Sequence, residues 1–214
     1  MLLAMEHDSM AVRSLVVRAA ETAALLIADP AVRDRWSMPS ALAGLDVGAL
    51  AAHLVRATGA TLAYLDRGTG EGPLLDAVGY FDHAITSPIH ERIREVSASE
   101  ASAGHAEVDA KARSVAAELA LRLPAEPHDR TIGALHQRRI SLDDFCRTRL
   151  IEILMHVDDL AASVGVETPW VDVAATGHII DVLIGIGRAR HGDWAVIRAL
   201  GRAERSVPGT FPVL

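Results

Sequence analysis

Apolar residues recur every three or four positions along several long stretches of this chain, which is typical of amphipathic helices that bury one face. The first stretch begins after Asp8 or Ser9 and ends at Asp29–Pro30, because proline disfavours helical backbone in the residue before it. Its buried face consists of Val12, Leu15, Val16, Ala19, Ala23 and Leu26. We therefore predict a first helix over residues 8–29.

Further helices are predicted where the same periodicity is bounded by capping residues and by glycine or proline. They span residues 47–66, capped by Asp46; a stretch from Ser99 or Ser102 to Leu123; residues 141–163, opened by Ser141 and closed by Gly165; and residues 172–190 and 193–202. Residues 68–98 begin with several glycines and a proline, so we expect a loop around one or two short helical turns. Residues 124–140 are expected to form a loop with a short extended piece.

This order of elements predicts an all-α fold. Four long helices with one long crossover form a bundle over residues 1–166, and a helical C-terminal extension over residues 167–214 packs on it. The composition agrees, since half of the residues are apolar and only 4% are aromatic. Small and aliphatic side chains favour helix packing over a strand-rich sandwich.

Charge and cysteine content exclude several classes of protein. The formal net charge of −7 argues against nucleic-acid binding, because affinity for phosphate needs clustered positive charge. No stretch holds the ~18 uncharged apolar residues that a membrane span needs, and the first residues lack the basic region of a signal peptide. The single cysteine, Cys146, excludes an internal disulfide and a cysteine-rich metal site. We expect a cytoplasmic protein without nucleic-acid or membrane partners, and a homodimer is compatible with the sequence.

Candidate chemistry centres on Glu152 and His156 in the helix predicted over residues 141–163. Side chains four positions apart point the same way, so this carboxylate and imidazole can reach one divalent ion. A third donor is needed, and His53 is the best candidate because it lies among apolar residues at helical spacing. Two imidazoles and a carboxylate suit zinc and leave a fourth position open, while nickel, iron or manganese accept the same ligand types.

Each of these residues also has an ordinary structural interpretation. Glu152 and His156 match a common solvated pair on helices, and His53 matches a hydrogen-bonded core histidine. Asp159, one turn beyond His156, would accept the distal N–H of a ligand histidine. Arg149, one turn before Glu152, would orient that carboxylate or bind an anionic substrate. Asp159 and Arg149 fit an exposed ion-pair network along the helix equally well.

Two motifs follow each other along the chain. The first is Ala51-Ala-His53-Leu-Val-Arg56, preceded by the connector Trp36…Pro39-Ser40…Leu45-Asp46, and the second is Arg149-x-x-Glu152-x-x-x-His156-x-x-Asp159-Leu160. Together, over roughly residues 8–165, they resemble the mycothiol-dependent maleylpyruvate isomerase family. The N-terminal domain of that family is a four-helix bundle of the DinB-like metalloenzyme superfamily.

The resemblance implies a DinB-like bundle and a divalent metal, usually zinc (Zn2+), held by His53, Glu152 and His156. It also implies mycothiol, a low-molecular-weight thiol, as the cosubstrate. The metal would lower the thiol pKa, and the resulting thiolate would attack a small electrophile. With maleylpyruvate, the thiolate would add to the cis double bond, allow rotation, and leave to give fumarylpyruvate.

The sequence departs from the isomerase after the bundle. The isomerase carries a separate mixed α/β domain there, whereas the residues after Val166 are predicted to be helical. Isomerase and thiol transferase activities are therefore equally open. The competing class is a non-catalytic helical metal-binding or regulatory module.

Overall fold

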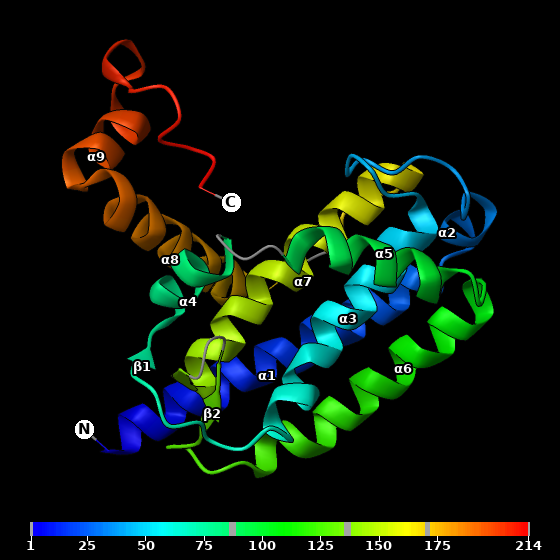
Figure 1. Cartoon of the computed structure of the whole chain (residues 1–214), viewed down its shortest axis with the longest axis horizontal. Helices are drawn as coiled ribbons and strands as arrows, with labels where there is room; N and C mark the ends of the chain where they lie inside the picture. Colours follow the sequence, from blue (N-terminus) through cyan, green and yellow to red (C-terminus); the bar gives the residue numbers. More distant parts are fainter. Residues whose placement is uncertain (1, 86–88, 135–137, 170–171, 214) are drawn as a thin grey trace.

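The computed structural model describes residues 2–85, 89–134, 138–169 and 172–213, and within these ranges four long helices form the body of the protein (Figure 1). They are α1 (Leu2–Ile27), α3 (Val47–Leu65), α6 (His105–Arg122) and α7 (Leu142–Val164). Helices α6 and α7 each pack against both α1 and α3, so the four helices close a ring around one apolar core. The predicted all-α bundle with a long crossover is confirmed.

The ends of α3 and α7 follow from local sequence. Ser141 Oγ accepts a hydrogen bond from Asp144 N at 3.0 Å, which satisfies one of the N–H groups left free at the start of α7. Asp46 Oδ1 accepts from Ala49 N at 2.7 Å and caps α3 in the same way. Gly165 ends α7 with φ of 71°, a left-handed conformation that glycine adopts without strain. Both helices that carry candidate ligands therefore begin at their predicted caps.

The segment between α3 and α6 differs from the prediction. Instead of a loop with one or two short turns, it contains helices α4 (Ala77–Ile85) and α5 (Ile89–Ala101), and α5 packs along α3. The glycines and proline that favoured a loop interrupt only residues 68–73, before these helices begin. Helix α6 begins at His105, after Gly104 with φ of 89°, and the predicted start at Ser99 or Ser102 is wrong.

A small sheet connects the crossover to the start of α7. Strands β1 (Leu74–Leu75), β3 (Arg139–Ser141) and β2 (Thr131–Gly133) lie in that order, with β1 parallel and β2 antiparallel to β3. The loop predicted over residues 124–140 thus contains more extended structure than expected, because pairing with distant β1 stabilises it. The remaining short helices in the described ranges are α2 (Pro30–Asp34), η1 (Leu123–Ala125) and η3 (Ala203–Arg205).

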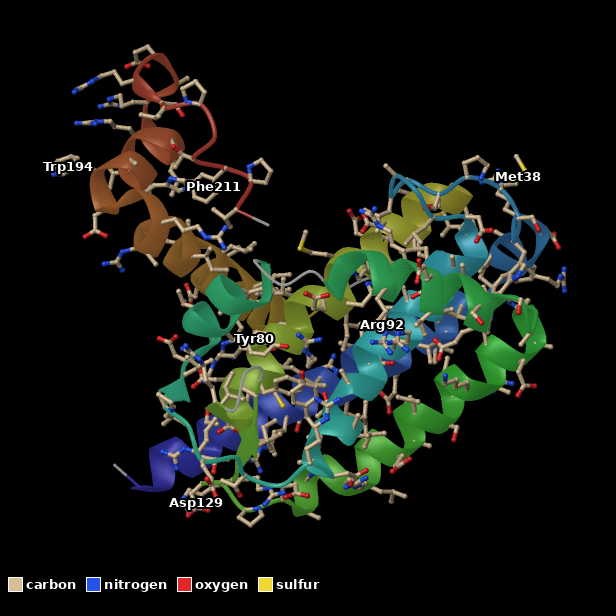
Figure 2. All side chains as sticks on the ribbon, in the orientation of Figure 1. Met38, Tyr80, Arg92, Asp129, Trp194 and Phe211 are labelled. Carbon is tan, nitrogen blue, oxygen red and sulfur yellow. The ribbon has the colours of Figure 1, made fainter. Side chains whose placement is uncertain are left out.

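The C-terminal residues form helices α8 (Val173–His191) and α9 (Asp193–Gly201), close to the predicted bounds. Helix α8 packs against α4 and α7, and α9 continues from α8 on the side away from the bundle (Figure 1). Trp194 points outwards from α9 and is 69% exposed, whereas Phe211 lies against α8 at Gly187 (Figure 2). None of the described helices is long and apolar enough to cross a bilayer. The division into domains at residue 166 stays a prediction.

Candidate metal centre

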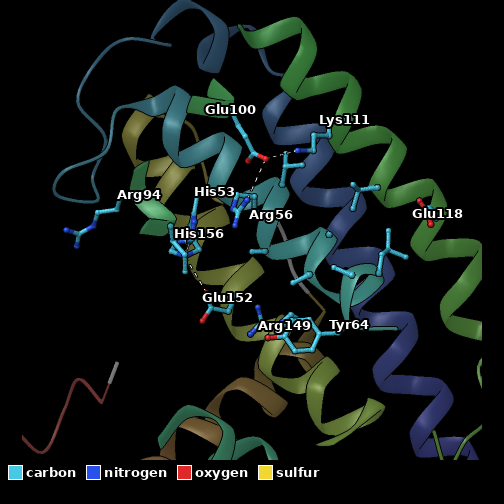
Figure 3. A pocket seen from close by; sticks show the side chains of 18 of the residues that line it. His53, Arg56, Tyr64, Arg94, Glu100, Lys111, Glu118, Arg149, Glu152 and His156 are labelled. Atoms are coloured by element: carbon cyan, nitrogen blue, oxygen red, sulfur yellow. Dashed lines mark hydrogen bonds and ion pairs between the residues drawn. The ribbon is translucent and has the colours of Figure 1, made fainter. Parts of the chain in front are cut away.

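Three candidate ligands converge where α3 and α7 pack together. His53 on α3 lies opposite Glu152 and His156 on α7, and one donor atom from each residue lies within 4.8 Å of the other two. The Nε2 atoms of His53 and His156 are 3.1 Å apart, and Oε2 of Glu152 lies 3.8 Å from Nε2 of His156. Figure 3 shows the two rings side by side, with Glu152 next along α7. The structure therefore brings together the residues on which the metal prediction depends.

Asp159 contacts the other side of the His156 ring. Its Oδ2 lies 3.1 Å from Nδ1 of His156. An ionised carboxylate can only accept a hydrogen bond, so Nδ1 carries the proton. In the neutral form of the ring, Nε2 is then left with a lone pair directed at His53 and Glu152. This is the tautomer that a ligand histidine needs, and the metal-supporting role of Asp159 stays a prediction.

His53 contacts a residue of the crossover. Ser97 on α5 is fully buried, and its Oγ lies 3.5 Å from Nδ1 of His53. Burial, assisted by the nearby His156, lowers the pKa of His53 to about 4, although Glu152 opposes this shift. His53 is therefore uncharged at neutral pH, and it offers a lone pair to a cation.

The spacing of the donors fits a divalent metal ion. Zinc ligands lie about 2.0–2.2 Å from the ion, which places two donors of a tetrahedral site about 3.3–3.6 Å apart. The observed separations of 3.1 and 3.8 Å lie on either side of this range. The Glu152 side chain is 31% exposed, so it has room to rotate toward the two imidazoles. Two nitrogens and one carboxylate oxygen suit zinc, and nickel or iron accepts the same atoms.

The three donors line a cavity of about 800 Å³, and Arg149 lines it one turn before Glu152 (Figure 3). Arg149 is only 8% exposed, and its guanidinium lies 4.9 Å from the ring centre of Phe145 and 5.8 Å from that of Tyr80. Its Nε donates to Thr148 Oγ1 at 3.2 Å. Among the described residues, no carboxylate lies within ion-pair distance of Arg149. Arg149 therefore does not join an ion-pair network along α7.

Tyr64 and Tyr80 line the cavity and Ser97 contacts His53, but none of these three residues was predicted from the sequence. Tyr64 stacks on Phe145 with ring centres 4.6 Å apart. Helical spacing did indicate Tyr64. This residue follows His53 by 11 positions, so the two side chains project about 20° apart around the same helix. Ser97 and Tyr80 fall in the segment predicted as a loop, so no helical spacing indicated them.

Cys146 is fully buried and lies outside the cavity lining. Burial raises the pKa of its thiol to about 12, so only about one molecule in ten thousand carries the thiolate at pH 8. We expect a thiol reagent such as dithionitrobenzoate to leave the native protein unmodified at pH 8. The same reagent should titrate one thiol per chain in denaturant. Rapid labelling of the native protein would contradict this prediction.

Replacing Asp159 by alanine is expected to weaken metal binding about 10- to 100-fold, because His156 loses the group that holds its tautomer and ring orientation. Competition with a chelator of known affinity measures the change. Asp158→Ala is a matched control, because Asp158 Oδ1 accepts from Thr168 and does not contact the histidines. An equal loss of metal affinity in both variants would show that the affinity depends only on the general negative charge near the site.

The family described as the mycothiol maleylpyruvate isomerase N-terminal domain matches residues 16–161. The matched range is more than half of the chain and includes the three candidate ligands as well as Arg149 and Asp159. Searches among curated proteins and among solved structures found no match.

Proposed function

Because the chain belongs to the family of the mycothiol maleylpyruvate isomerase N-terminal domain, we propose that it is a metal-dependent enzyme that uses mycothiol as cosubstrate. The enzyme either isomerises a small electrophile with the help of mycothiol or transfers mycothiol to that electrophile. One observation carries the proposal: two imidazoles and a carboxylate converge in the wall of a cavity of about 800 Å³. Structural zinc sites are closed by four protein ligands, whereas three ligands leave a position open, as in catalytic sites.

The residues around the centre have separate roles in this proposal. A divalent metal held by His53, Glu152 and His156 would supply a Lewis acid that lowers the pKa of a bound thiol. Asp159 keeps a proton on Nδ1 of His156, so that Nε2 stays available as a donor atom. Cys146 is buried and protonated, and therefore the nucleophilic sulfur comes from the cosubstrate.

Arg149 is the residue that we expect to orient the electrophile. A guanidinium stays charged at any physiological pH, and this one is largely withdrawn from water. A carboxylate of the substrate would neutralise it through two parallel hydrogen bonds. Burial raises the pKa of Tyr80, so its hydroxyl stays protonated, and Tyr64 and Tyr80 provide aromatic walls. A small electrophile that carries a carboxylate fits this surrounding best.

The function is tested with metal-loaded and metal-free protein, mycothiol, and electrophiles that include maleylpyruvate, an epoxide and a haloaromatic. We expect product only with metal-loaded protein, either an isomer with mycothiol regenerated or a thioether with mycothiol consumed. Equal activity of the metal-free protein would overturn the proposal. A stoichiometric metal without any turnover would instead support the non-catalytic module.

Arg149→Met is expected to lower kcat/KM about 10- to 100-fold for an electrophile that carries a carboxylate. The reason is the loss of a charged hydrogen-bond pair worth about 1.5–3 kcal/mol. An uncharged haloaromatic should be converted almost as fast as by the wild type. Arg92→Met is the control, because Arg92 is exposed and does not line the cavity. Equal losses for both substrates would contradict the anion-binding role.

A further inference from the structure

The cavity extends along α3 well beyond the metal donors. The α3 residues that line it run from His53 to Tyr64, which is 11 positions or about 17 Å of helix. On the opposite wall, Lys111, Val115 and Glu118 lie on one face of α6. A small acid bound beside Arg149 would leave this part of the cavity unfilled. The cavity therefore has room for a second, longer ligand.

Small residues form the floor of the groove between α3 and α6. At 100° per residue, Gly59 and Ala63 lie about 40° apart, so they share one side of α3. A Cβ atom added at Gly59 would lie 3.8 Å from the methyl groups of Val115, so the backbone of α3 is close to α6 here. Ala63 lines the same groove and is exposed. Gly59 and Ala63 therefore leave space for a ligand beside the backbone of α3.

A polar cluster closes one end of this groove, and it consists of Arg56 on α3, Glu100 on α5 and Lys111 on α6 (Figure 3). Lys111 Nζ lies 3.0 Å from Glu100 Oε1, and Arg56 Nη1 lies 3.6 Å from the same oxygen. The other oxygen, Oε2, is buried and has no hydrogen-bond partner in the described part of the chain. A small rotation of this carboxylate lets a ligand hydroxyl or amide N–H satisfy it.

The Arg56 cluster lies next to the metal donors. Arg56 is one helical turn after His53, and both residues line the same cavity. A ligand whose sulfur reaches the donors can therefore place its remaining atoms at the cluster. The Arg149 side of the cavity stays free for the electrophile.

The chemistry of the cluster favours a neutral, hydroxyl-rich ligand. Glu100 accepts hydrogen bonds while Arg56 and Lys111 donate them, and a hydroxyl group can do both. An anion would need cations without a carboxylate between them, and here Glu100 already pairs with both. Mycothiol has the matching body, a cysteine thiol carried by an amide-linked sugar and an inositol.

We propose that the Arg56 cluster and the groove between α3 and α6 bind the hydroxyl-rich body of the thiol cosubstrate. This inference rests on the proposed function and adds the residues that select which thiol is used. It assigns the two sides of the cavity to different ligands, with the cosubstrate along α3 and α6 and the electrophile beside Arg149.

Calorimetric titration of the metal-loaded full chain with mycothiol and with N-acetylcysteine amide tests the inference. The two probes share the thiol, and only mycothiol has the sugar body. We expect the wild type to bind mycothiol at least about ten-fold more tightly. Glu100→Ala removes the acceptor of the cluster, and Ala63→Phe fills the groove from an exposed position. Each variant should lose the preference for mycothiol and keep the affinity for N-acetylcysteine amide.

Asp109→Ala is the matched control, because Asp109 pairs with Arg113 on α6 and does not line the cavity. It should keep the wild-type preference. Equal affinity of the wild type for both thiols would overturn the inference. It would also be overturned if the Glu100→Ala and Ala63→Phe variants kept the preference for mycothiol or lost affinity for both thiols to the same extent. Binding of neither thiol by the metal-loaded wild type would overturn the proposed function itself, so the two failures are distinguishable.

Discussion

Replacing His156 by alanine is expected to abolish stoichiometric metal binding. The wild type should retain close to one divalent ion per chain, because three donor atoms lie within 4.8 Å of one another. Loss of a supporting residue already costs about 10- to 100-fold in affinity, so loss of a ligand should cost at least about 100-fold. His53→Ala should have the same effect from the opposite helix. Elemental analysis and chelator competition measure both changes.

His191→Ala is the control for these two variants, because His191 is exposed at the end of α8. It should retain the wild-type metal content. Thermal unfolding gives a second readout, since an ion that binds only the folded state raises the midpoint of the wild type and leaves that of His156→Ala unchanged. If the wild type retains no metal when zinc, nickel, iron and manganese are each supplied, the metal site is wrong.

Replacing Arg13 by methionine is expected to lower the free energy of unfolding by about 3–5 kcal/mol. Arg13 is 2% exposed, and its Nε donates to Asp143 Oδ1 at 2.8 Å. Its terminal nitrogens donate to the carbonyl oxygens of Glu126 and Pro127 at 2.6 and 2.9 Å. Removing the guanidinium leaves a poorly solvated carboxylate and two carbonyls without this donor. Urea unfolding followed by circular dichroism measures the loss.

Arg18→Met is the matched control on the same helix. Arg18 pairs with Asp172 at 2.7 Å, but its side chain is 54% exposed, so water replaces the lost interaction. Its loss should cost less than about 1 kcal/mol. If the two substitutions lowered the free energy of unfolding by similar amounts, the buried position of Arg13 would not explain its contribution to stability.

Part of the candidate centre could be predicted from sequence because it lies within single helices. The spacing of Glu152 and His156 puts both on one face of α7, and Asp159 follows one turn later on the same helix. His53 was found because an imidazole interrupts an apolar face of α3. These inferences need only the helical repeat, which is local.

Other features of the cavity depend on helices far apart in the chain. Ser97 reaches His53 only because α5 packs along α3, and the local pattern of that segment predicted a loop. Arg56, Glu100 and Lys111 come from three helices, so none of their spacings along the chain indicates the cluster. The pairing of β1 with β3 is likewise a contact between distant segments, and sequence periodicity alone does not report it.

The sequence by itself determined the helical class, the caps of α3 and α7, and the common face of Glu152 and His156. Each of these follows from interactions between residues a few positions apart. The tertiary structure decided which buried faces meet, and so it placed His53 3.1 Å from His156, 103 residues away in the chain. It also decided that Arg149 lines the cavity without a carboxylate partner in the described ranges. Periodicity shows that a face is buried, but only the packing of the whole chain selects the face against which it is buried.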